Sequence, residues 1–207
     1  MIFKKLVLGM LHTNCYILGD ENTGEVAVFD PGAKVENIIT TIEKNEYSVK
    51  YIIITHAHFD HVLALDELKK KYPDAKIVVH SADEPYLNVD SGNFSRHFKT
   101  YPPKSKADIC VNDGDKLNVG NVELTIWHTP GHSRGSMCIL ADGMVLSGDT
   151  LFYMSIGRTD FDGGDFDEIV ESLKRLATLP DDTKVYPGHG DATTIGFEKE
   201  NNQFMRG

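Results

Sequence analysis

Residues 55–61 read Thr55-His56-Ala57-His58-Phe59-Asp60-His61, and this stretch directly follows the unbroken apolar run 51–54. An apolar run of this length with a polar boundary predicts a buried strand. The leucine pattern over residues 63–68 then predicts a helix that ends before Pro73. The sequence therefore places three histidines and one aspartate on the connection between a buried strand and a helix.

Short β-branched and aromatic runs lie on both sides of this stretch, and turn residues separate them. The predicted strands are Ile2–Leu8, Cys15–Leu18, Val26–Phe29, Tyr51–Ile54, Ile77–His80, Lys116–Val119, Val122–Trp127, Ser136–Leu140, Met144–Leu146 and Lys184–Tyr186. A helical apolar spacing over residues 35–42 follows the first strands. Strands grouped at both ends of the chain, each group followed by helices, predict an α+β, four-layer αββα sandwich. Its two mixed sheets would pack face to face, with helices on both outer faces.

The clearest helix signal lies after Asp165. Asp165 as N-cap with Glu168 three residues later is a capping-box pattern, and Pro180 is predicted to end the helix. One face of this helix is apolar. The residues of that face are Phe166, Ile169, Val170, Leu173, Leu176 and Ala177.

Composition limits the classes of protein and partner. The chain has 207 residues, 41% of them hydrophobic, which fits one domain over residues 1–207 with a core of its own. Its 21 Lys and Arg stand against 31 Asp and Glu, a net charge of −10. Because nucleic-acid binding depends on cations that neutralise phosphates, we expect neither a nucleic-acid partner nor an anionic membrane surface.

The cysteines and the N-terminus point to a compartment. Cys15, Cys110 and Cys138 are odd in number and far apart, so neither a disulfide framework nor a thiolate zinc site is expected. The apolar stretch 6–11 is too short for a signal peptide, and no run reaches transmembrane length. We therefore expect a cytoplasmic protein.

The chemistry is concentrated in histidine and aspartate. A lone pair of histidines could be a surface cluster, but four potential ligands in the 55–61 segment favour a metal site. Further ligands must come from elsewhere, and His132, Asp149 and His189 each follow a predicted strand next to glycine. The other histidines are expected to be structural or to orient ligands; they are His12, His80, His97 and His128.

Four motifs carry a resemblance to a known family. THAHFDH, TPGHSRGS, SGDTLF and YPGHG, in this order, resemble the metal-binding motifs of the metallo-β-lactamase superfamily, and the match extends over nearly the whole chain. Within that superfamily, DTLFYMSIGRTDF at residues 149–161 resembles the short, single-domain relatives of glyoxalase II, the hydroxyacylglutathione hydrolases. The resemblance implies the αββα sandwich expected above.

The resemblance also implies a ligand set when it is carried over position by position. His56, His58 and His132 would bind one divalent metal ion, and Asp60, His61 and His189 would bind a second. Asp149 would bridge the two ions, and Asp60 and Asp149 are the expected catalytic residues. Zinc is the expected metal; iron and manganese stay open, because such sites take any of them.

The implied reaction is hydrolysis of a hydroxyacyl thioester, similar to S-lactoylglutathione, to a hydroxy acid and a free thiol. A hydroxide held between two metals would attack the thioester carbon, and the only partner expected is this small-molecule substrate. Asp149 differs from the cysteine that the resemblance leads us to expect in true β-lactamases, so β-lactam hydrolysis is disfavoured. The acidic composition disfavours the tRNA-processing branch.

Two residues are candidates for substrate binding. They are Arg158 and Phe152. Arg158 stands at a position where glyoxalase II also carries a basic residue near the thiol carrier, although it could equally form an internal ion pair with Asp160 or Asp162. Full-length glyoxalase II has a helical glutathione-binding domain that does not follow the last motif here. The Gly157-Arg158-Thr159-Asp160-Phe161 segment also resembles persulfide dioxygenases, which oxidise glutathione persulfide with one iron, so this reaction is the alternative.

Overall fold

The first six strands form one mixed sheet in the order β1-β2-β3-β4-β5-β6. The computed structural model describes residues 1–89 and 100–206, so His97 lies outside the described residues. The strands are β1 (Ile2–Leu8), β2 (Thr13–Gly19), β3 (Glu25–Phe29), β4 (Ser48–Ile53), β5 (Lys76–His80) and β6 (Ile109–Val111). β1, β2 and β3 pair antiparallel, and the pairs from β3 to β6 are parallel.

The second sheet has the order β14-β13-β10-β9-β8-β7 and is also mixed, because only β10 and β13 pair in parallel. Its strands are β7 (Lys116–Val119), β8 (Val122–His128), β9 (Met137–Ala141), β10 (Met144–Gly148), β13 (Lys184–Pro187) and β14 (Thr193–Thr194). A small hairpin of β11 (Leu151–Phe152) and β12 (Ser155–Ile156) leaves the end of β10.

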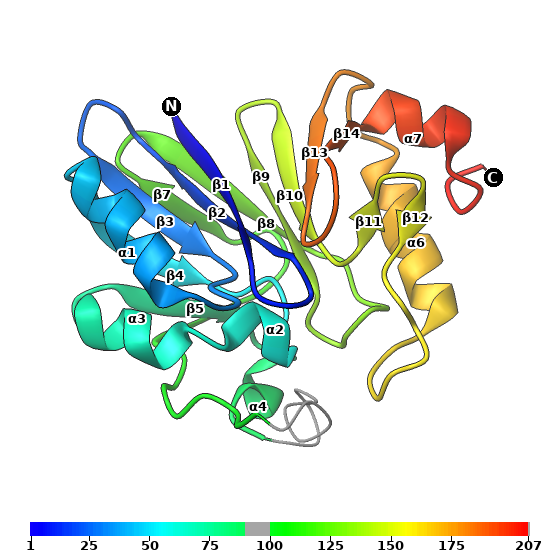
Figure 1. Ribbon diagram of the computed structural model, residues 1–207. Coiled ribbons are helices and arrows are strands. Elements are labelled where there is room, and N and C mark those ends of the chain that lie inside the picture. The colour runs from blue at the N-terminus through cyan, green and yellow to red at the C-terminus, as the bar shows by residue number, and fades with distance from the viewer. Residues whose placement is uncertain (90–99, 207) are drawn as a thin grey trace.

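Helices cover the outer faces of both sheets, as Figure 1 shows, with α1 and α3 beside the first sheet and α6 beside the second. The helices are α1 (Val35–Lys44), α2 (Phe59–Val62), α3 (Leu65–Lys71), α4 (Glu84–Leu87), α6 (Phe166–Leu176) and α7 (Ile195–Asn201). The predicted four-layer α+β sandwich is therefore confirmed. Among the described residues, no helix has both the length and the apolar character needed to cross a membrane.

Side-chain alternation along the strands builds two separate apolar layers in the first sheet. In β2, Ile17 packs in the cluster under α1 and α3, and its neighbour Leu18 packs in the cluster between the sheets. In β3, Val28 and Phe29 divide in the same way, because successive side chains of a strand point to opposite faces. A third cluster joins the second sheet to α6 through residues such as Leu173.

Several element boundaries differ from the sequence prediction. The strand expected at 51–54 runs from Ser48 to Ile53, and the helix expected over 63–68 is two short helices, α2 and α3, because Leu63 and Ala64 form a turn between them. Six short elements were not predicted; they are β6, β11, β12, β14, α4 and α7. Segments of two to seven residues carry too little periodicity to be recognised.

The helix after Asp165 begins as predicted. The Asp165 carboxylate accepts a hydrogen bond of 3.0 Å from the backbone N–H of Glu168. The apolar face is buried at Ile169 and Leu173, but Phe166 is 51% exposed. The helix ends at Leu176, before the predicted stop at Pro180, because Ala177 to Leu179 form a turn.

Candidate metal centre

Four connections meet at one end of the sandwich and bring the seven candidate ligands together. β4 leads into the 55–61 segment and α2, and the turns after β8, β10 and β13 supply the other three ligands. The β1–β2 turn lies beside the turn after β13 (Figure 1), where the Asn14 N–H donates to the Gly188 carbonyl at 2.7 Å. The strand ends of both sheets therefore position one site.

Three imidazoles form the first ligand group. His56, His58 and His132 each place one ring nitrogen within 4.8 Å of the others, and all three side chains are buried. Nε2 of His132 lies 3.2 Å from Nε2 of His56. Three imidazole nitrogens that converge on one point are a donor set typical of a zinc or iron site.

Asp60, His61 and His189 form the second ligand group, with one donor atom each within 4.8 Å of the others. Oδ2 of Asp60 lies 3.1 Å from Nε2 of His189 and 3.5 Å from Nε2 of His61. His61 is fully buried, whereas the His189 side chain is 26% exposed. This group is therefore mixed in charge and reaches the surface.

Asp149 lies between the two groups. Its Oδ2 lies 3.6 Å from Nε2 of His132 in the first group and 3.6 Å from Nε2 of His189 in the second. Its Oδ1 lies 3.5 Å from Nε2 of His61. One carboxylate thus contacts both sets, which is the arrangement expected of a bridging ligand.

The side chains fit a pair of metal ions. Nε2 of His61 and Oδ1 of Asp149 are buried without a hydrogen-bond partner, and such atoms are rare in proteins unless another group satisfies them. A Cβ on Gly188 would lie only 2.1 Å from Oδ1 of Asp149. The backbone therefore leaves space beside atoms that need a partner, and the nitrogen and carboxylate donors suit zinc, iron or manganese.

The second ring nitrogen of three ligands is held by the protein. Nδ1 of His132 donates to the Arg158 carbonyl at 2.7 Å, and Nδ1 of His189 donates to the Leu11 carbonyl at 3.0 Å. Nδ1 of His61 lies 3.0 Å from Oδ2 of Asp30, which is buried. Such contacts fix the tautomer, so that Nε2 faces the metal side. Sequence reasoning missed these partners, because each contact joins segments far apart in the chain.

Two residues of β2 support the second group and were also missed. The Thr13 hydroxyl donates to Oδ2 of Asp60 at 3.1 Å. The Asn14 amide donates to the carbonyls of Pro187 and Gly190 at 2.8 and 2.9 Å, so it holds both sides of the His189 turn. Their only sequence signal was a polar pair at the start of an apolar strand.

The electrostatics of the side chains differ between the two groups. Burial, followed by the neighbouring imidazoles, holds the pKa of His56 well below its usual value, and burial does the same for His58. Burial also opposes the charged form of His61, but the carboxylates of Asp60, Asp149 and Asp30 raise its pKa to about 10. Burial therefore disfavours the charged form of His56 and His58 in the first group, whereas the carboxylates around His61 favour its charged form in the second.

A cavity of about 660 Å³ opens above the ligands, a size typical of small-molecule sites. Its walls are mostly apolar, and both predicted substrate residues line it. The non-ligand lining residues are Leu11, Phe59, Phe152, Ile156, Arg158 and Phe161. The Arg158 guanidinium makes two hydrogen bonds to the Asp160 carboxylate, at 2.9 and 2.7 Å, and lies over the Phe161 ring. The internal ion pair with Asp160 is thus present.

The other described histidines lie outside both ligand groups. The rings of His80 and His128 stack with centroids 4.0 Å apart, and Nε2 of His128 donates to the Arg134 carbonyl at 2.8 Å. His128 therefore supports the loop that carries His132, which agrees with the structural role predicted for it. His12 is exposed in the β1–β2 turn.

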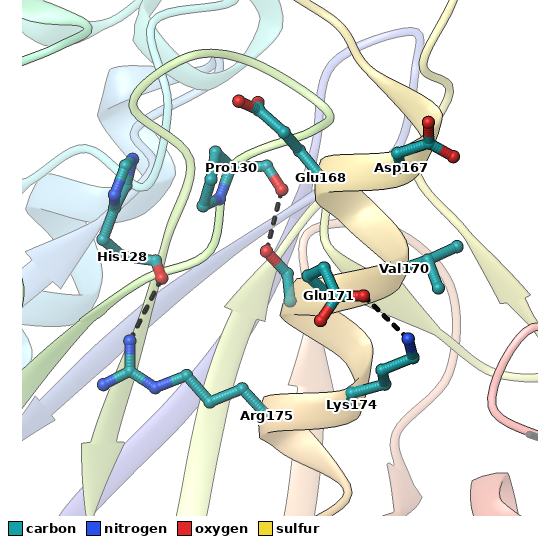
Figure 2. Close-up of a pocket in the computed structure, with 9 residues that line it drawn as sticks. His128, Pro130, Asp167, Glu168, Val170, Glu171, Lys174 and Arg175 are labelled. Carbon is teal, nitrogen blue, oxygen red and sulfur yellow. Dashed lines mark hydrogen bonds and ion pairs between the residues drawn. The ribbon is translucent and has the colours of Figure 1, made fainter.

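A second hollow, of about 580 Å³, lies between α6 and the turn after β8 (Figure 2) and contains none of the seven ligands. Arg175 donates to the His128 carbonyl at 3.3 Å, and Ser172 donates to the Pro130 carbonyl at 2.8 Å. These hydrogen bonds join α6 to the backbone of residues 128–130, just before His132. We assign this hollow a structural role behind the metal centre.

The fold and the arrangement of the candidate ligands are typical of metallo-hydrolases. The family model "Metallo-beta-lactamase superfamily" matches residues 8–189. The chain belongs to this superfamily, as its motifs predicted. It is 34% identical to the "Probable metallo-hydrolase YqgX" of Bacillus subtilis, over 100% of this chain and 99% of the relative. It is 32% identical to the "Hydroxyacylglutathione hydrolase GloC" of Haemophilus influenzae, over 93% and 92%.

Three solved structures share the fold at similar identity. A structure described as the BLEG-1 B3 metallo-β-lactamase has a TM-score of 0.93 and 34% identity, and the match covers 100% of each chain. TTHA1623 in a di-iron-bound form has a TM-score of 0.87 and 33% identity, covering 97% and 99%. ETHE1 from Myxococcus xanthus has a TM-score of 0.82 and 31% identity, covering 98% and 84%. The relatives thus include a protein described as a β-lactamase, one described as a hydroxyacylglutathione hydrolase and one described in a di-iron-bound form.

Proposed function

We propose that this chain hydrolyses the thioester of a hydroxy acid on a small thiol carrier, as in S-lactoylglutathione. The observation that carries the proposal is the pair of ligand groups joined by Asp149 at the floor of a cavity with mainly apolar walls. The similarity to a hydroxyacylglutathione hydrolase supports the substrate class.

His56, His58 and His132 would hold one metal ion, Asp60, His61 and His189 the other, and Asp149 would contact both. Two bound divalent ions, expected to be zinc, supply Lewis acidity that polarises a carbonyl and lowers the pKa of water toward neutrality. The protein must then orient the thioester and keep competing groups away from its carbonyl carbon.

The side chains around the cavity fit direct attack by water. Among the described residues that line it, none carries a hydroxyl or thiol that could act as a nucleophile. The Asp60 carboxylate stays ionised: burial opposes its charge, but His61 and His189 lower its pKa. Asp60 can therefore accept a hydrogen bond from water, while Phe152 and Ile156 shield the acyl group from solvent.

A persulfide dioxygenase is the second candidate function. It is favoured by the Gly157–Phe161 segment and by the similarity to ETHE1 from Myxococcus xanthus. The second ligand group argues against it, since a single iron needs only one group and His189 completes the other. β-Lactam hydrolysis is included in the experiment below because of the similarity to a B3 metallo-β-lactamase.

One preparation, loaded in turn with zinc and with iron, separates the three activities. We expect cleavage of S-lactoylglutathione that releases one free thiol per ester. Iron-dependent oxygen uptake with glutathione persulfide, without thioester cleavage in either form, would establish the dioxygenase instead. Cleavage of a cephalosporin faster than of any thioester would move the assignment to β-lactams.

A further inference from the structure

Asp83 is a buried carboxylate outside both ligand groups. It follows β5 and directly precedes α4, with Pro85 in the first turn, so its position is that of a helix N-cap. Yet its carboxylate accepts no capping hydrogen bond from α4. The side chain is only 2% exposed, and a buried carboxylate is costly unless hydrogen bonds satisfy it. Its partners therefore reveal its role.

Those partners lie on the two segments that carry the first ligand group. Oδ2 accepts the backbone N–H of Ala57 at 2.9 Å and the Ser133 hydroxyl at 2.9 Å. Oδ1 accepts the backbone N–H of Gly135 at 2.6 Å. Ala57 lies between His56 and His58 in the chain, and Ser133 follows His132. One carboxylate thus joins both segments that bring the three imidazoles together.

The loop that carries His132 packs directly against Asp83. A Cβ on Gly135 would lie 2.5 Å from the Asp83 backbone nitrogen and 2.6 Å from its Cβ, so no other residue fits there without a shift. The Ser133 and Ser136 hydroxyls lie 2.8 Å apart and close the loop on itself. The contact is therefore specific and has little room to adjust.

We propose that Asp83 is a positioning residue that sets the spacing of His56, His58 and His132 and thereby the affinity of the first metal. The proposal rests on the metal centre assigned above. A carboxylate is needed because it accepts hydrogen bonds at both oxygens. An asparagine would place its NH₂ group against the N–H of either Ala57 or Gly135. Two hydrogen-bond donors that face each other repel, so the segment that carries His56 and His58 would move away from the loop that carries His132.

The test compares Asp83→Asn with Asp20→Asn. Asp20 is also buried and accepts the N–H groups of Asn22 and Asn121, but it lies at the opposite end of β2 from the ligands. Both variants are also made in a His189→Ala background, in which only the first group can hold a metal. Zinc affinity is measured by competition with a chromophoric chelator, and the thermal midpoint is measured on metal-free protein.

We expect Asp83→Asn to weaken zinc binding in the His189→Ala background by about 10- to 100-fold, the usual effect of losing a partner behind the ligands. Asp20→Asn should lower the thermal midpoint and leave zinc affinity unchanged. If Asp83→Asn lowers only the thermal midpoint, Asp83 is merely structural and the proposal is wrong. This measurement uses no substrate. It therefore tests the role of Asp83 even if the chain proves not to be a thioesterase.

Ser133→Ala provides the milder variant, in case Asp83→Asn does not fold. It removes one of the three hydrogen bonds and leaves both backbone contacts in place. We expect a loss of zinc affinity smaller than 10-fold, again confined to the first group. Unchanged affinity in Ser133→Ala, with Asp83→Asn unfolded, would overturn the proposal, since no part of the network would then affect the metal.

Discussion

The two ligand groups differ in chemistry although they share one carboxylate. His56, His58 and His132 are all imidazoles and are at most 6% exposed. The second group contains the Asp60 carboxylate, and its His189 side chain is 26% exposed and lines the cavity. The first group therefore consists of buried imidazoles alone, whereas the second contains a carboxylate and a partly exposed histidine.

The two ligand groups are also held in place by different residues. The segments of the first group are held by Asp83 and by the Arg158 carbonyl on His132. The second group is held by the Asp30 carboxylate against His61 and by the Thr13 hydroxyl on Asp60. The two ligand groups are therefore held by different parts of the fold, so variants of each group should have separable effects.

The largest effect is expected for Asp149→Ala, because the Asp149 carboxylate lies beside histidines of both groups. This variant should lose both metals and nearly all thioester hydrolysis. Elemental analysis of the purified protein, together with the S-lactoylglutathione assay, measures both. Cys110→Ser, at an exposed position, is the control and should keep two metals per chain. Retention of one metal by Asp149→Ala would show that one group is complete without it.

His189→Ala should have the next largest effect and should affect one group only. The second group then keeps only Asp60 and His61 beside the shared carboxylate, so it loses one of its four ligands and binds its metal more weakly. The metal content should fall from two ions to one per chain, with a large loss of kcat. A stoichiometry that is one in the wild type and stays at one would contradict the model of two metals.

Sequence reasoning found the ligands because they are concentrated or flanked by glycine. The segment from His56 to His61 holds four of them, and the turns at His132 and His189 carry glycines that allow tight packing. The structure brings all seven together, and their role as ligands stays a prediction until metal is measured. Local sequence was sufficient here because each motif lies at a strand end, and strand ends meet.

The residues that hold the ligands in place could not be predicted, because their contacts join segments far apart in the chain. Asp83 has the sequence context of a helix cap. Only the folded chain shows that its carboxylate accepts hydrogen bonds from Ala57, 26 positions away in the chain, and from Ser133, 50 positions away. Asp30 and Thr13 likewise contact residues of the 55–61 segment. Contacts of this length depend on how the sheets pack, which no short pattern contains.

Acid should destabilise the fold through His80, which lies beside the loop that carries His132. Burial, and then the stacked His128 ring, lower the pKa of His80 from 6.5 to about 4. Between these values the unfolded chain binds more protons than the folded chain, so the free energy of unfolding decreases as the pH falls from 6.5 to 4. The stabilising effect is complete above pH 6.5. His128 supports the loop of His132, so the loss concerns the first group.

Urea unfolding of metal-free protein between pH 7 and pH 4 measures this effect. His80→Gln should make the free energy of unfolding less dependent on pH in this window. His12→Asn is the matched control, because His12 is exposed and asparagine tolerates its positive φ of 57°. An equal pH dependence in wild type and His80→Gln would show that another group causes the acid sensitivity.

The smallest effect is expected at the mouth of the cavity, where Arg158 and Asp160 form an ion pair. Both side chains are about two-thirds exposed, at 65% and 64%. Water screens exposed pairs of this kind, so a substrate carboxylate can compete with Asp160 for the guanidinium. Arg158→Ala should therefore raise KM for S-lactoylglutathione by roughly two- to fivefold with kcat unchanged. The backbone bond from His132 to residue 158 is retained, so metal content should not change.

Asp160→Asn decides between substrate binding and loop shaping. If Arg158 binds a carrier carboxylate, removing the competing charge of Asp160 frees the guanidinium, and KM should fall while Arg158→Ala raises it. If the pair only shapes the loop, breaking it from either side disturbs the same structure, and KM should rise in both variants. We expect opposite shifts, because Arg158 lines the cavity and its pair with Asp160 is open to solvent. Parallel increases in KM would assign the pair to the loop alone.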